Sequence, residues 1–250
     1  MVTINYDVEG EIKSAYIRAP FDKGKEALER KGYRIISLEE NARVRMQEGN
    51  YSSVSRKGNF TREGIIYVPK KGIFLTKNSP IMENAKEATD CHRQGSQFYL
   101  TDEQVESAME NSVELKRENI PTKRFKDNKI TVYAFGDYAE QYGKFLENAG
   151  VRKMHVWLEY RKHNSFATQM WFSEIRNNPL QVAMRVGSPS RSDLECNCDL
   201  EGSVSVRGIL NSAKGTVKDY EAYTPKQIAK ALKDLGFSKL EKGLVKKLRQ

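Results

Sequence analysis

The sequence predicts a mixed α/β or α+β protein built on a mixed sheet, and three observations carry this prediction. Short stretches with alternating apolar and polar residues, such as residues 2–8 and 179–186, are typical of strands. Ser37 and Thr101 are each followed three residues later by Glu or Gln, a pattern that caps helices. Residues 129–163 combine both signals and predict strand, helix and strand in succession.

This last segment predicts a βαβ unit. Residues 130–135 are apolar on both faces, as expected for a strand that is covered on both sides in a parallel sheet. Asp137 can cap the following helix, which Gly150 ends, and residues 154–160 alternate again. If the two strands are parallel, Asp137 and Glu159 lie at the same edge of the sheet.

The elements before this unit follow from local signals. Residues 2–18 predict a hairpin, residues 22–30 a helix that ends at Gly32, and residues 33–36 a strand. Further helices are expected after Ser37, Ser79 and Thr101, and a second hairpin over 64–77. Residues 49–62 are polar and predict a loop, in which Arg56 and Lys57 suit contacts with phosphate.

The elements after residue 163 are less regular. Residues 165–175 fit either a strand or a buried helix, and residues 202–210 predict a strand. Two amphipathic helices are expected from Thr224 onward, the second with Leu240, Leu244 and Leu248 on one face. We therefore expect an N-terminal α+β part (1–120), a central α/β part with the βαβ unit (121–212) and a C-terminal basic two-helix tail (213–250).

Composition and charge limit the classes of partner and the cellular compartment that we expect for this protein. The net charge is +9 and the pI about 9.3, which favours anionic partners. Residues 214–250 hold ten Lys or Arg against four Asp or Glu, so the excess is concentrated at the C-terminus. The low mean hydropathy and the absence of a long apolar run or a secretory signal predict a cytoplasmic protein without a membrane partner.

The cysteines do not predict a metal site or a disulfide framework. Cys196 and Cys198 are separated by one residue, whereas structural zinc sites usually space their cysteines by two to four. Cys91 and His92 are the other residues that could bind zinc. Three cysteines that are buried or have no chemical role explain the pattern better. The standard nucleotide, hydrolase and zincin motifs are absent, so no cofactor is expected.

The leading hypothesis is a protein that binds DNA or RNA without sequence preference, through backbone phosphates. Clustered cations on one face of a helix pair make salt-dependent contacts with phosphate. The residues expected to do so are Lys226, Lys230, Lys233, Lys239, Lys242, Lys246, Lys247 and Arg249 of the tail, with Arg56 and Lys57.

Two alternatives stay open. The first is a metal-dependent nuclease or phosphoester hydrolase with Asp137, Glu159 and Arg161 as catalytic residues, and this alternative alone requires Mg²⁺. Each of these residues also has a structural explanation, as a helix cap or as an exposed ion pair. The second alternative is a non-catalytic protein-interaction module that docks an acidic protein partner.

Overall fold

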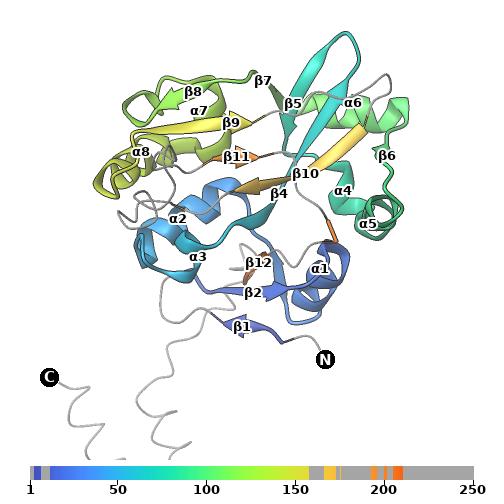
Figure 1. Cartoon of the computed structure of the whole chain (residues 1–250), viewed down its shortest axis with the longest axis horizontal. Helices are drawn as coiled ribbons and strands as arrows, with labels where there is room; N and C mark the ends of the chain where they lie inside the picture. Colours follow the sequence, from blue (N-terminus) through green and yellow to red (C-terminus); the bar gives the residue numbers. More distant parts are fainter. Residues whose placement is uncertain are drawn as a thin grey trace, which may run out of the picture. The chain divides into compact units, whose positions relative to one another are not determined.

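The computed structural model of the 250-residue chain describes residues 3–6, 12–157, 166–172, 175, 193–195, 200–201 and 205–210. The chain divides into two compact units, residues 1–210 and 211–250, and all of the described residues belong to the first. Its ribbon is shown in Figure 1. The predicted tail helices lie outside the described residues.

Among the described residues, a twelve-stranded mixed sheet organises this unit, which confirms the predicted fold class. Its main order is β1-β2-β12-β4-β10-β11-β9-β8. A branch leaves this order at β4, where β5 pairs with β4 and β7 pairs with β5. β12 is parallel to β4 and β11 to β9, and the other pairs are antiparallel. The strands are β1 (Asn5–Tyr6), β2 (Ser14–Arg18), β3 (Tyr33–Ile35), β4 (Asn59–Val68), β5 (Gly72–Thr76), β6 (Phe98–Tyr99), β7 (Ser112–Leu115), β8 (Asn119–Pro121), β9 (Lys153–Trp157), β10 (Phe166–Phe172), β11 (Leu194–Glu195) and β12 (Ser205–Leu210).

Helices occupy most of the connections between the strands. The predicted capping boxes form, with Ser37 paired to Glu40 and Thr101 paired to Gln104. The helices are α1 (Phe21–Glu29), α2 (Leu38–Glu48), α3 (Ser53–Arg56), α4 (Pro80–Glu83), α5 (Ala85–Arg93), α6 (Asp102–Glu110), α7 (Lys129–Phe135) and α8 (Ala139–Asn148), with the 3₁₀ turns η1 (Thr122–Arg124) and η2 (Gly136–Tyr138).

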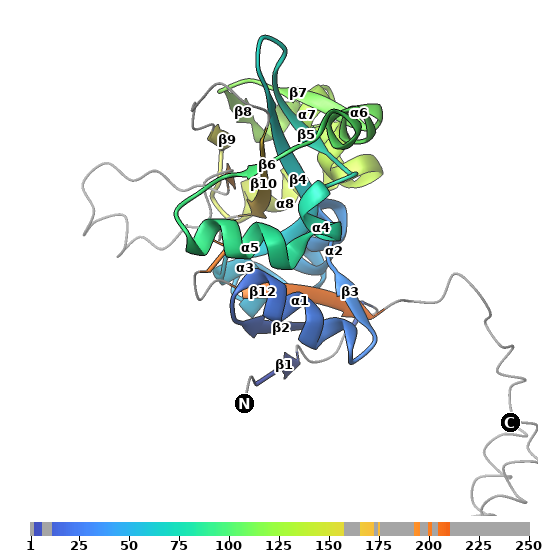
Figure 2. The ribbon, with the colours of Figure 1, turned by 90° about the vertical axis from the view of Figure 1, so that its right-hand side faces the viewer.

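The predicted hairpins are present. β1 pairs with β2, and β4 pairs with β5 in a ribbon that projects beyond the neighbouring helices (Figures 1 and 2). The segment left open between strand and helix contains the strand β10. The predicted loop over 49–62 is wrong in part, because it contains α3 and the start of β4.

The predicted βαβ unit is wrong in its first element, because residues 129–135 form helix α7 rather than a strand. The Asn128 side chain caps this helix by accepting hydrogen bonds from the backbone nitrogens of Ile130 (2.9 Å) and Thr131 (3.3 Å). Ile130, with Ala134 and Phe135, is buried in the core. The cap and this burial together override the preference of β-branched residues for strands.

Two main hydrophobic clusters hold the unit together. One joins α2, α7 and α8 to strands β4, β5 and β9, and the other joins α1 and α5 to β2 and β12. The first contains Leu75 from before residue 120 and Tyr142 from after it, so both predicted parts share a core. That the chain before residue 120 folds independently of the chain after it stays a prediction.

Gly143 allows the close approach of α8 to η1. A Cβ atom at this position would lie 2.5 Å from the backbone oxygen of Thr122, closer than real Cβ contacts. The neighbour that Gly143 allows α8 to approach is therefore a 3₁₀ turn and not a strand of the sheet. Among the described helices, none has the length and apolar character needed to cross a membrane.

Candidate functional site

A surface cavity of about 630 Å³ lies between β7, β8, η1 and the start of α7. These elements lie at the top of Figure 1, and we call the cavity the β7–β8 groove. Its position follows from chain order, because only residues 116–118 separate β7 from β8. The two strands nevertheless pair with different neighbours, β7 with β5 and β8 with β9.

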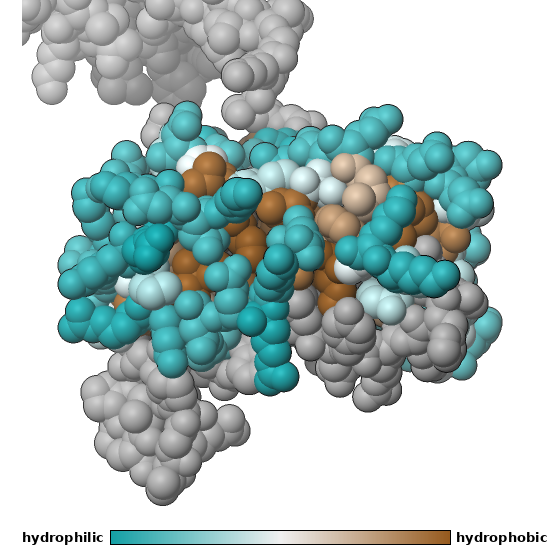
Figure 3. Space-filling view, turned by 90° about the horizontal axis from the view of Figure 1, so that it is seen from above, coloured by the Kyte–Doolittle hydropathy of each residue, from teal (hydrophilic) through white to brown (hydrophobic). Residues whose placement is uncertain are grey.

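Four apolar residues line the groove, and we call this set its floor. It is formed by Val113 of β7, Ile120 and Pro121 of β8, and Ile130 of α7. Ile120 and Ile130 belong to the core, Val113 is half-buried and Pro121 is exposed. Figure 3, viewed from above, shows apolar surface in the middle of this face with hydrophilic side chains around it. The groove therefore offers a partner apolar contact area on a rigid base.

The rim of the groove is charged. Its members are Glu114, Lys116, Glu118, Arg124, Asp127 and Lys129. Two of the three carboxylates already have partners, since Glu114 lies 3.6 Å from Lys116 and Glu118 accepts a weak hydrogen bond from Asn128 (3.4 Å). Within the described part of the chain, Arg124 and Lys129 have no ion-pair partner. They are thus the cations most available to a ligand.

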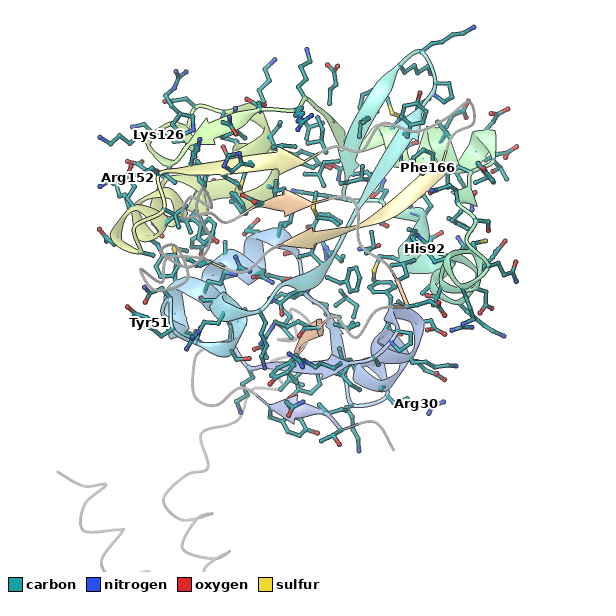
Figure 4. All side chains as sticks on the ribbon, viewed as in Figure 1. Arg30, Tyr51, His92, Lys126, Arg152 and Phe166 are labelled. Atoms are coloured by element: carbon teal, nitrogen blue, oxygen red, sulfur yellow. The ribbon has the colours of Figure 1, made fainter. Side chains whose placement is uncertain are left out.

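The surface around the rim is strongly basic. Residues 116–129 with Arg152 and Lys153 carry eight Lys or Arg and two Asp or Glu. All six bases of residues 116–129 are exposed, as is Arg152. Lys126 and Arg152 lie at the same corner of the unit in Figure 4, the former within 3.8 Å of Glu140. This excess creates a positive potential at the mouth of the groove.

Both strands that line the groove have an unpaired edge. β5 is the one partner of β7, and β9 the one partner of β8, among the described residues. An edge strand carries backbone N–H and C=O groups that can pair with an added strand. An apolar floor, a charged rim with two unpaired cations, and open strand edges thus occur together at one place.

The residues predicted for catalysis are not placed as expected. Asp137 lies in the η2 turn between α7 and α8, instead of at the end of a strand. Glu159 and Arg161 lie outside the described residues. The geometric premise of a shared sheet edge is therefore wrong, and the catalytic role of the three residues stays a prediction. No three His, Cys, Asp or Glu side chains form a metal-binding group in the described part of the chain.

Arg56 and Lys57 lie at the end of α3 and just beyond it. Arg56 is exposed, whereas Lys57 donates a hydrogen bond to the Tyr16 hydroxyl (2.7 Å) and lies 4.3 Å from the ring centroid. This hydrogen bond is the main cause that lowers the pKa of Tyr16. Lys57 is thus engaged within the protein. The predicted nucleic-acid-binding residues of the tail lie outside the described residues.

Comparison with known proteins finds one similar solved structure. No protein-family profile matches the chain, and no curated protein sequence matches it. A solved structure from Nanoarchaeota, described as the accommodation of massive sequence variation by the C-type lectin fold, is similar with a TM-score of 0.53 and 11% sequence identity. The likeness covers 80% of this chain and 96% of that one. The chain resembles a C-type lectin fold.

This likeness overturns the leading sequence hypothesis. The prediction of nucleic-acid binding took the basic helix pair of the C-terminal tail as the functional part of the protein. The structural neighbour instead has a C-type lectin fold. The prediction of a nucleic-acid-binding protein is therefore corrected.

Most of the rim cations lie in a basic run, residues 117–129, which spans the predicted boundary between the N-terminal and central parts. The run is visible in the sequence, whereas the groove depends on β7 and β8 pairing with β5 and β9. The Asn128 cap was the local signal that could have revealed α7 and, with it, one wall of the groove.

Proposed function

We propose that this protein is a non-catalytic protein-interaction module and that the β7–β8 groove holds an extended segment of a protein partner. The observation that carries the proposal is an apolar floor bordered by two sheet edges that lack a second partner strand. Strand addition to such an edge is a recurring mode of peptide recognition. The likeness to a C-type lectin fold supports the non-catalytic class of function. The binding surface is inferred from the groove.

The size of the groove suits a short segment rather than a whole protein face. A cavity of about 630 Å³ lies within the range of ligand sites, which bind through a mainly apolar surface and a few polar groups. The polar groups here sit on rigid elements, because Arg124 lies on η1 and Lys129 on α7. A segment that enters the groove can therefore be held by its backbone and by alternate side chains.

Selection from a library of random peptides on the full-length chain tests this function. A photo-cross-linking residue, benzoyl-phenylalanine, then replaces Lys116 at the rim or, as a control, the exposed Lys31 after α1. We expect selected peptides to cross-link at position 116 and not at position 31. Failure to recover any peptide above background, or cross-linking at position 31 alone, would contradict the proposal.

A further inference from the structure

We infer that the partner segment in the β7–β8 groove is acidic, with carboxylates that alternate with apolar side chains along an extended backbone. This inference rests on the proposed function and adds the chemistry of the partner to it. It follows from three features of the groove: its floor, its rim and its strand edges.

The floor requires apolar side chains. Val113 and Pro121 offer apolar surface that water contacts when the groove is empty, and the core residues Ile120 and Ile130 lie beneath it. Covering such surface contributes about 25 cal/mol per Å² of apolar area removed from water. In an extended segment, alternate side chains point to the same side, so every second residue can reach the floor.

The rim requires negative charge on the intervening residues. Arg124 and Lys129 are exposed and without an ion-pair partner in the described part of the chain, while Glu114 is already close to Lys116. Asp127 is the rim carboxylate with no hydrogen-bond or ion-pair partner among the described residues, and it lies between the two free cations in sequence. The basic surface beyond the rim adds long-range attraction for an anionic segment and disfavours a basic one.

The strand edges require a protein backbone. β7 is a four-residue strand with one partner, and a segment along its open edge would gain main-chain hydrogen bonds that do not depend on side chains. A nucleic acid could use the rim cations but has neither alternating apolar side chains nor a polypeptide backbone for the edge. Residues 211–250 of this chain carry a basic excess, so like charge disfavours them as the occupant.

The test uses fluorescein-labelled short peptides and the full-length chain, with affinity measured by fluorescence anisotropy. The probe alternates Glu with Val, and its neutral match alternates Gln with Val. We expect the Glu peptide to bind about tenfold more tightly, the ratio given by two or three partly exposed ion pairs. A third peptide, N-methylated at alternate residues of the Glu probe, should bind at least about tenfold more weakly because it cannot complete the strand edge.

A pair of matched double variants locates the effect. Arg124→Glu with Lys129→Glu should remove the preference for the Glu peptide, whereas Lys23→Glu with Lys31→Glu, the same charge change around α1, should preserve it. The inference would be overturned if the Glu and Gln peptides bound with equal affinity. It would also be overturned if a single-stranded DNA probe bound as tightly as the Glu peptide. Groove-dependent peptides of neutral or basic composition would overturn the inference while leaving the proposed function in place. The absence of any groove-dependent peptide would overturn both.

Discussion

Glu63 is a carboxylic acid with almost no exposure to solvent, at 1% of its surface. It lies on β4, and its Oε2 atom accepts a hydrogen bond from the backbone nitrogen of Leu38 (2.9 Å), the first residue of α2. Burial raises its pKa to about 7, because the charged form loses hydration that its hydrogen bonds and nearby Arg62 do not replace. This residue links the sheet to a helix start and makes the link sensitive to pH.

The sign of this effect is fixed by linkage. The folded state holds the Glu63 proton more tightly than the unfolded chain, whose carboxyl has a pKa near 4.5. Stability from this group is therefore complete below pH 4.5 and is lost as the pH rises to about 7, by up to about 3 kcal/mol.

Glu63→Gln should remove this pH dependence. The Gln side chain is neutral at all pH values and can still accept the hydrogen bond from Leu38. Urea unfolding should find the variant more stable than the wild type at pH 8, by up to about 3 kcal/mol, and close to it at pH 4. The control is Glu110→Gln at an exposed position. A stability difference that does not change with pH would contradict the assignment.

The elements show which parts of the fold are accessible from the sequence. The caps at Ser37 and Thr101 were predicted because both partners of a capping box lie within three residues of each other. The order of strands was not, since β4 pairs with β10 across about a hundred residues of chain. The groove depends on such pairings, so its basic residues were visible in the sequence and its shape was not.

Helix α7 shows how a periodicity argument fails. Ile130, Thr131 and Val132 are β-branched, and apolar residues on both faces of the segment suggested a buried strand. In the folded chain one face lies in the core, while Val132 is 43% exposed. The short apolar run alone could not separate strand from helix.

The substitution Asn128→Ala tests the helical state of residues 129–135 in solution. Loss of the cap should lower the free energy of unfolding by about 1 kcal/mol, because two backbone N–H groups lose their acceptor. Asn148→Ala, at the exposed last residue of α8, is the matched control and should stay within about 0.5 kcal/mol of the wild type. Chemical denaturation measures both. Equal values for the two variants would argue against the cap.

At the scale of the whole unit, the chain brings two ends of the branched sheet together. β7 and β8 end opposite branches of the strand order and yet are joined by three residues. Helices α7 and α8 pack with strands β4, β5 and β9 in the first core cluster. The groove is therefore a consequence of the fold, and a ligand there contacts rigid elements.

The positive charge has a different meaning once the fold is known. The sequence suggested a tail that contacts phosphate, whereas the described unit concentrates basic side chains at the corner marked by Lys126 and Arg152 in Figure 4. Arg124 and Lys129, near Lys126 in the sequence, line the groove together with its apolar floor, and this combination suits an acidic protein segment better than a bare polyanion.

Hydrogen–deuterium exchange on the full-length chain, with and without the Glu–Val peptide, tests the central claim most directly. Strand addition to β7 should slow exchange in residues 112–121, where edge amides gain partners, and leave α3 unchanged. Protection confined to residues outside 112–130, with peptide bound, would contradict the β7–β8 groove as the binding site.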